Sequence, residues 1–312
     1  ATASYFAIRI LAAPFTLLNY SILGWLLGQA RAGTGLLLQT VLNGANIILS
    51  LYLGLHLQWG LTGVAWATVA AEAIATVLGL YLFWSATGSN GAIDWQRVFH
   101  RSALMRLFAV NRDIMIRTFA LILAFAFFTA QGAQFGETTL AANAILMNFF
   151  MVSGYLLDGF ATSAEQLAGR ALGANYRPAF DRAVKLTLVW GFVLAAIATL
   201  IFLIGGTWLI DTLTVSTDVR AEARVYLIWA AITALVGVAA FQMDGVYIGA
   251  TWSVEMRNMM LISLAAYFIA WWIATPLFGN HGLWFALEIF LGMRGITMLM
   301  RLPRKAKESF GS

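Results

Sequence analysis

One acidic residue of this chain stands deep inside a long apolar stretch. Asp244 lies within residues 226–249, where most neighbours are apolar. A charged side chain in the middle of a bilayer costs roughly 2.5–3.5 kcal/mol and usually faces an interior cavity where ions or substrates pass. We therefore predict that Asp244 marks a binding site on an ion or substrate path. The alternative is a structural aspartate that is hydrogen-bonded to a neighbouring helix.

The residues around this aspartate suit a binding site between helices. Gly245 and Gly249 are four positions apart, a spacing that lets a second helix approach closely. Gln242, Met243 and Tyr247 are predicted to line a substrate chamber. Aromatic faces attract organic cations and thioethers adapt to varied shapes, so these side chains suit a compliant, apolar pocket.

A second acidic residue, Asp158, lies towards the end of another apolar stretch, residues 139–161. A carboxylate that has lost its water can hold a proton or Na⁺ in one conformation of a protein and release it in another. Asp158 is therefore a second candidate for cation coupling. Alternatively, it forms a structural ion pair with an arginine at the same end of the bundle.

Three charged residues, Arg112, Asp113 and Arg117, surround the start of the apolar stretch 114–134. Asp113 and Arg117 are four positions apart, so we predict an ion pair along one helix face. Such a pair either latches a gate or anchors the helix at the membrane surface.

Polar residues and a proline inside other apolar stretches are further candidates. Asn43 and Asn46 are three positions apart and either join two helices or line the substrate path. Glu72 and Glu288 either face the chamber or pair with a neighbouring helix. Pro14 removes a backbone hydrogen bond in the first stretch and is a predicted hinge.

The composition places these residues in a membrane. Of the 312 residues, 61% are hydrophobic and 11% are charged, whereas soluble domains are nearer a quarter charged. The chain has no cysteine, and its three histidines are scattered, so we expect no metal site. Its basic residues lie mainly between apolar stretches, which indicates membrane topology rather than binding to nucleic acid.

Nine stretches are long and apolar enough to cross a bilayer, which takes about 20 residues each. We predict an all-α, polytopic membrane helix bundle with nine transmembrane helices. The predicted spans are 5–27, 36–55, 61–84, 114–134, 139–161, 183–209, 226–249, 259–278 and 283–300.

Lysine and arginine predict the orientation of the chain. Arg9, Arg220 and Arg224 lie on one side, and the other sixteen of the 19 basic residues lie on the opposite side. The basic side is normally cytoplasmic. We therefore expect a multi-pass protein of the cell inner (plasma) membrane with a cytoplasmic C-terminus.

A repeat predicts how the spans are grouped. Gly24 and Gly28 recur as Gly245 and Gly249 at an offset of 221 residues, so the first three spans resemble the last three. Parallel repeats of this kind are one way to build a transporter.

We predict half of one lobe in residues 1–86, an amphipathic cytoplasmic linker in 87–112 and a complete six-helix lobe in 113–312. A solvated linker is the alternative for 87–112. On this reading, three further helices, on the order of 110–130 residues, precede Ala1 in the intact protein.

Several motifs together resemble the multidrug and toxic-compound extrusion (MATE) family, in its DinF-like branch. The resemblance extends over essentially the whole chain. The motifs are Asn111-Arg112-Asp113 with Arg117, Leu157-Asp158-Gly159-Phe160, Met243-Asp244-Gly245, Glu255 with Arg257-Asn258, and Gly279-Asn280-His281-Gly282.

The resemblance implies two six-helix lobes around a central chamber. It implies export of bulky organic compounds, often cationic, in exchange for H⁺ or Na⁺, with no other cofactor. In the family, an acidic residue of the tenth helix takes part in cation coupling, and Asp244 matches that position. Some members also use an acidic residue of the seventh helix, but residues 118–131 contain none. We expect a monomer whose partners are the lipid bilayer and small organic substrates, with no nucleic acid.

Three other functions fit these residues less well than an antiporter does. A flippase for lipid-linked sugars shares the architecture, but it should carry more basic residues inside its helices to bind a phosphate head group. A membrane acyl- or glycosyltransferase should carry a clustered pair of aspartates or of aspartate and histidine at the membrane surface, and none is visible. Asp244 argues against a purely structural membrane subunit.

Overall fold

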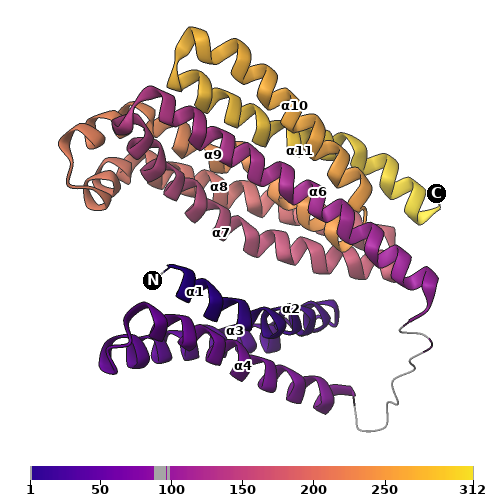
Figure 1. The fold of residues 1–312 in the computed structure, drawn as a ribbon. Helices are drawn as coiled ribbons and strands as arrows, with labels where there is room; N and C mark the ends of the chain where they lie inside the picture. The colour runs from indigo at the N-terminus through magenta and orange to yellow at the C-terminus, as the bar shows by residue number, and fades with distance from the viewer. Residues whose placement is uncertain (1, 88–95, 97–98, 312) are drawn as a thin grey trace. The chain divides into compact units, whose positions relative to one another are not determined.

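The computed structural model describes residues 2–87, 96 and 99–311 as helices joined by short loops (Figure 1). Backbone polar groups inside a bilayer must be satisfied within the chain, which favours helices as spanning elements. The described residues contain no strand, and they contain nine helical spans that are long and apolar enough to cross a membrane. The predicted all-α membrane bundle with nine spans is therefore confirmed.

Two compact units, Ala1–Val98 and Phe99–Ser312, make up the chain. The first unit contains three of the spans, in which α4 contacts the other helices. Its elements are α1 (Thr2–Arg9), η1 (Ile10–Ala12), α2 (Ala13–Gly28), α3 (Ala32–Leu49), the π-helix η2 (Ser50–His56) and α4 (Gly60–Thr87).

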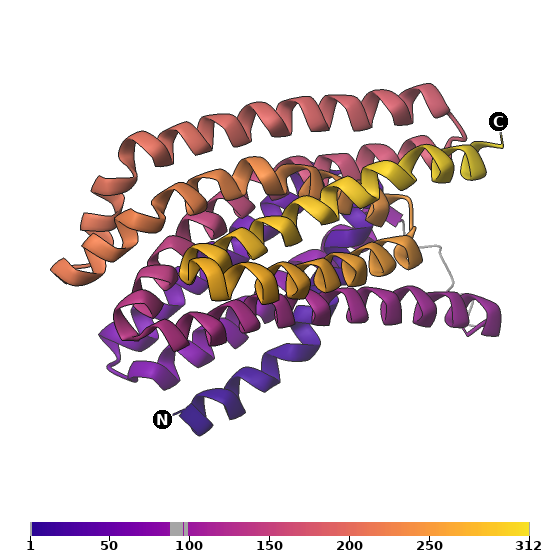
Figure 2. The ribbon, with the colours of Figure 1, turned by 90° about the horizontal axis from the view of Figure 1, so that it is seen from above.

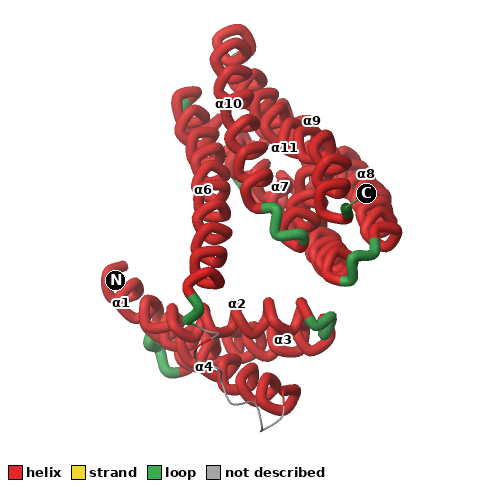
Figure 3. Tube along the Cα trace, turned by 90° about the vertical axis from the view of Figure 1, so that its right-hand side faces the viewer, coloured by secondary structure: helices red, strands yellow, loops and turns green. Residues whose placement is uncertain are grey.

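The second unit contains the other six spans, whose long helices run roughly alongside one another (Figure 2). In the series α7 to α11, each helix is followed by the next after three residues or fewer. The directions of these helices therefore alternate (Figure 3). The elements are α6 (Arg101–Gly132), η3 (Ala133–Phe135), α7 (Glu137–Gly173), α8 (Arg177–Leu213), α9 (Thr217–Gly249), α10 (Ser253–Phe278) and α11 (Asn280–Phe310).

Helix α9 lies at the centre of the second unit, in contact with α7, α8 and α11. The close contact with α7 depends on two glycines. A Cβ atom added to Gly245 would collide with the carbonyl oxygen of Ala161, and one added to Gly249 would collide with that of Glu165. The predicted close approach of a second helix at these two glycines is confirmed.

Helix α6 follows a different path from its neighbour in sequence. It packs mainly on α10, whereas α7 packs on α8 and α9. Helices α6 and α7 therefore share few contacts, and space is left between them.

The structure differs in part from the prediction of a separate linker in residues 87–112. Residues 88–95, 97 and 98 lie outside the described residues. Residues 101–112 form the first turns of α6, which continues without a break to Gly132, and not a separate surface helix. The boundary between the two units falls at Val98 and Phe99.

Candidate functional site

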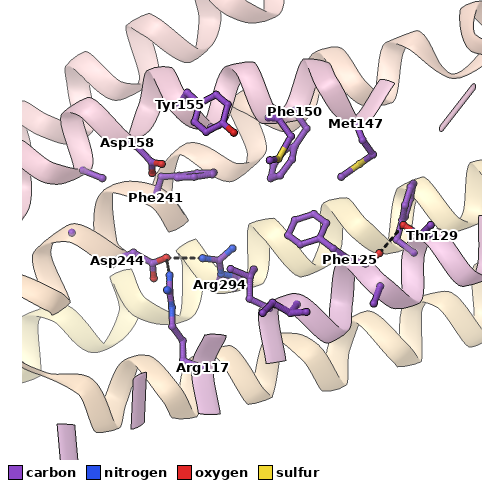
Figure 4. A pocket seen from close by; sticks show the side chains of 18 of the residues that line it. Arg117, Phe125, Thr129, Met147, Phe150, Tyr155, Asp158, Phe241, Asp244 and Arg294 are labelled. Atoms are coloured by element: carbon purple, nitrogen blue, oxygen red, sulfur yellow. Dashed lines mark hydrogen bonds and ion pairs between the residues drawn. The ribbon is translucent and has the colours of Figure 1, made fainter. Parts of the chain in front are cut away.

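A cavity of about 920 Å³ lies between α6 and α7 in the second unit, with α9 and α11 contributing to its wall (Figure 4). Most of its lining is apolar. The aromatic and thioether side chains that line it are Phe125, Phe128, Met147, Phe150, Met151, Tyr155 and Phe241. A cavity of this size and character can hold a drug-sized organic molecule.

Three charged side chains from three helices meet at one edge of the cavity. Asp244 on α9 accepts hydrogen bonds from Arg117 on α6 and from Arg294 on α11, both through the same oxygen, Oδ2 (Figure 4). The Arg294 contact measures 2.6 Å. Asp244, predicted as a coupling residue, thus lies in the cavity wall and not against lipid.

Not all polar atoms of Asp244, Arg117 and Arg294 have a hydrogen-bond partner among the described residues. The second carboxylate oxygen of Asp244 and the Nε atoms of Arg117 and Arg294 are buried without a hydrogen-bond partner among the described residues. A buried charge is strongly destabilising when its partner is lost. A cation that binds Asp244 therefore has to compete with two guanidinium groups, and its binding would loosen the contact between α6, α9 and α11.

Two further carboxylates, Asp158 and Glu165 on α7, line the same cavity. They are seven residues apart, about two helical turns, and so lie on one helix face. Neither carboxylate forms a hydrogen bond or ion pair with another described side chain. The structural ion pair considered for Asp158 is therefore not formed.

The predicted ion pair between Asp113 and Arg117 is wrong. Asp113 is 1% exposed and binds Arg257 on α10 at 2.5 Å and Arg112 at 3.2 Å. Ser253 donates a further hydrogen bond to Asp113 over 3.3 Å. Asp113 thus holds α6 against the start of α10, while Arg117, one turn further on, reaches Asp244.

Tyr247, Gln242 and Met243 do not line the cavity, contrary to their predicted role. Tyr247 donates to the carbonyl of Met298 at 2.8 Å, and Gln242 donates to the carbonyl of Leu157 at 3.3 Å. Met243 is buried in an apolar cluster. Other helices pack around α9 at these residues, and one stripe of α9 faces the cavity. The stripe consists of Phe241, Asp244, Gly245 and Ile248.

The candidates of the first unit mostly join helices within that unit. Asn46 donates to Thr68 at 3.0 Å, and Asn19 donates to Glu72 at 2.7 Å. Asn43 is exposed. Their role in lining a chamber stays a prediction.

Pro14 does not lie in the middle of a regular helix. It stands within the first two positions of α2, directly after the 3₁₀ turn Ile10–Ala12. Proline is well tolerated at a helix start, because the first amide groups have no partner within the helix. Its role as a hinge stays a prediction.

Arg294 is a site residue that was not predicted from the sequence, where it counts among the cytoplasmic basic residues. Arg294 is 3% exposed and lies within α11. A signal was available, since Arg294 falls inside the predicted span 283–300, as Asp244 does inside 226–249. An acid and a base inside two apolar stretches are expected to pair.

A multi-pass helix bundle with an ion-paired, aromatic cavity within its spans has the architecture of a membrane transporter. Residues 114–274 match the MatE family, which is about half of the chain. The chain is also 36% identical over 295 residues to DNA damage-inducible protein F of Escherichia coli (strain K12), covering 94% of this chain and 64% of that protein. The chain therefore belongs to the MatE family.

More distant members of the family are also similar to this chain. Protein DETOXIFICATION 42 of Arabidopsis thaliana is 24% identical and is covered over 57% of its length, with 96% of this chain aligned. A crystal structure of the Vibrio cholerae MATE transporter VcmN has the same fold, with a TM-score of 0.88 at 18% identity. That match covers 99% of this chain and 70% of the transporter. The chain thus spans less than two thirds of the length of these curated relatives.

Proposed function

We propose that the protein is a secondary active antiporter, which exports bulky organic compounds, many of them cationic, in exchange for H⁺ or Na⁺. The observation that carries this proposal is the cavity in which unpaired carboxylates and aromatic rings lie together. Membership of the MatE family supports it. Transport proceeds by alternating access of two lobes, and the second unit forms one of them.

The lining of the cavity suits an organic cation. Asp158 and Glu165 supply negative charge that no described side chain neutralises, and Phe150 and Phe241 supply aromatic faces. A cation over an aromatic face is stabilised by roughly 0.5–2 kcal/mol, with the larger values at desolvated sites. The flexible side chain of Met147 can adapt to different ligands.

Asp244 is the proposed coupling residue, and Asp158 is a second candidate. Binding of H⁺ or Na⁺ at Asp244 would weaken its hold on Arg117 and Arg294, which lie on two other helices. Because three helices meet at this carboxylate, occupation by the ion changes how they are held together. This is the kind of link between ion binding and conformation that an antiporter needs.

The proposed transporter is a monomer in the inner membrane. The distribution of basic residues predicts that its C-terminus lies in the cytoplasm. It needs no cofactor other than the coupling ion.

A flippase for lipid-linked sugars is the second candidate, and one observation favours it. Arg117 and Arg294 lie inside spans and line the cavity, where a lipid phosphate would need basic groups. Arginine is well suited to bind phosphate through two parallel hydrogen bonds. Both arginines are already held by Asp244, which favours the antiporter.

The two candidates are separated by transport in lipid vesicles that contain the purified full-length protein. Efflux of a cationic dye is measured under a pH gradient and under a Na⁺ gradient, with Asp244→Asn and with Asp181→Asn as a control. Asp181 carries a surface-exposed carboxylate outside the cavity. Gradient-driven efflux that Asp244→Asn abolishes, and Asp181→Asn does not, supports the proposal. Unchanged efflux in Asp244→Asn removes this residue from coupling, and translocation of a fluorescent lipid-linked sugar without dye efflux favours the flippase.

A further inference from the structure

A further acidic group, Glu288, lies inside the second unit, away from the cavity. Glu288 on α11 is 7% exposed and is not among the residues that line the cavity. Both of its carboxyl oxygens are shielded from solvent and have no hydrogen-bond partner. No ion pair is found for it among the described residues.

The helix register places Glu288 on the face of α11 that packs against α9. Three other positions on this face are in contact with α9. The rings of Phe285 and Trp229 are 6.3 Å apart, a Cβ atom on Gly292 would lie 3.4 Å from Val236, and one on Gly295 would press on Ala239.

The residues 285, 288, 292 and 295 follow the three- and four-residue spacing of one helix face. Glu288 therefore lies opposite residues 232–233 of α9. Thr233 is fully buried there, but its hydroxyl donates to the carbonyl of Ala230 at 2.7 Å within its own helix.

The surroundings offer no partner for a charged carboxylate. Helices α6, α7, α9 and α10 contact α11. The titratable and charged groups on these helices and on α11 itself are Arg101, Arg106, Arg112, Asp113 and Arg117 on α6; Glu137, Tyr155, Asp158, Glu165 and Arg170 on α7; Asp218, Arg220, Glu222, Arg224, Tyr226, Asp244 and Tyr247 on α9; Glu255, Arg257 and Tyr267 on α10; and His281, Arg294, Arg301, Arg304, Lys305, Lys307 and Glu308 on α11. None of them forms a hydrogen bond or ion pair with Glu288. Burial of an unpaired charge costs several kcal/mol, so this carboxyl group needs a bound proton or cation.

We propose that Glu288 is a proton-binding site of this protein, in addition to the carboxylates of the cavity. A proton needs only one carboxyl oxygen, whereas a metal cation needs several ligands. The described residues contain no cluster of three or more acidic, histidine or cysteine side chains that could hold a metal ion. The step is a simple one: the carboxylate takes up one proton to become the neutral acid, and later releases it.

The position of Glu288 along α11 suits a group that exchanges protons through the helix bundle. His281 lies seven residues before it and Arg294 six residues after it, about 10 and 9 Å along the helix axis. The His281 end is polar, because the Nε1 atom of Trp229 donates to His281 at 2.9 Å. Glu288 thus stands between this polar end and the ion pair of Arg294 with Asp244.

Proton binding at Glu288 is tested without transport, so its outcome is independent of the dye efflux that tests the antiporter. Infrared difference spectra of the full-length protein in lipid vesicles are recorded across a range of pH, because the neutral carboxylic acid has a carbonyl band that the carboxylate lacks. The variants are Glu288→Gln, Glu288→Asp and, as a control, Glu165→Gln in the cavity. Glutamine has the shape of the neutral acid and should leave the fold intact, which thermal unfolding checks.

We expect a buried carboxylic acid band that responds to pH, disappears in Glu288→Gln, shifts in Glu288→Asp and persists in Glu165→Gln. A second readout is the labelling of Glu288 by a membrane-soluble carbodiimide, which reacts with protonated carboxyl groups. Spectra that are unchanged in Glu288→Gln would overturn the proposal, as would a band that does not respond to pH, which indicates a permanently neutral structural residue. Protection of Glu288 from labelling by Na⁺ at constant pH would replace the proton with a metal cation and also overturn it.

Discussion

Arg294 and Asp244 are separated by 50 residues in sequence and meet at 2.6 Å inside the second unit. Their side chains are 4% and 11% exposed. Arg117 binds the same carboxylate oxygen from α6, so one atom holds three helices together.

Replacing Asp244 by alanine should destabilise the protein strongly, because it leaves two buried guanidinium groups without their partner. The expected loss is roughly 3–5 kcal/mol of unfolding free energy, the range for breaking a buried ion pair. Thermal unfolding in detergent measures the effect. The control, Asp181→Ala, removes an exposed ion pair and should cost less than about 1 kcal/mol.

A double-mutant cycle tests whether Asp244 and Arg294 act on each other. In Asp244→Asn with Arg294→Met, both charges are gone, so the loss should be smaller than the sum of the two single losses. We expect a coupling energy of about 0.5–3 kcal/mol, the range for residues in contact. Additive single losses would mean that the pair does not contribute to stability.

The contact between α7 and α9 gives a separate prediction. Gly245→Ala adds a methyl group that collides with the carbonyl of Ala161, so the two helices must move apart. Overpacking of this kind costs roughly 1–3 kcal/mol. The matched control is Gly159→Ala on α7, where an added Cβ meets no atom within 4 Å. That variant should be neutral or up to about 1 kcal/mol more stable, because alanine favours a helix. Equal thermal stability of the two variants would contradict the close approach.

A buried amide pair between α7 and α11 gives a fourth prediction. Asn143 and Asn280 exchange hydrogen bonds of 2.8 and 2.9 Å, and Trp284 donates to Asn143 at 2.9 Å. Asn143→Leu leaves these buried groups unpaired, at an expected cost of about 1–3 kcal/mol. The same substitution at Asn148 should stay within about 0.5 kcal/mol, because this exposed residue bonds only to its own helix. Chemical denaturation of both variants provides the comparison.

The sequence predicted the spans and the close helix approach at Gly245 and Gly249 because both follow from local patterns. Apolar length alone identifies a span, and a four-residue spacing alone puts two glycines on one face. The burial of Asp244 was predictable for the same reason, since an acid inside an apolar stretch has few alternatives.

The partners of the charged residues were not predictable from local spacing. The four-residue interval between Asp113 and Arg117 favours an ion pair, but Asp113 binds Arg257 and Arg117 binds Asp244. These contacts depend on how α6 is rotated against α9 and α10, which the spacing along one helix does not fix. Tyr247 illustrates the same limit, because its three-residue distance from Asp244 was not enough to bring it into the cavity.

The carboxylates of α7 give the prediction that bears most directly on the substrate. Asp158→Asn removes one negative charge from the cavity and changes its shape little. The affinity for a lipophilic cation such as tetraphenylphosphonium should fall by roughly 1 kcal/mol, about fivefold. Binding of triphenylphosphine oxide, a neutral compound of similar shape, should not change. Fluorescence quenching or calorimetry measures both ligands, and Asp181→Asn serves as the control outside the cavity. An equal loss for the two ligands would indicate a change in cavity shape, and a loss for neither would exclude Asp158 from cation binding.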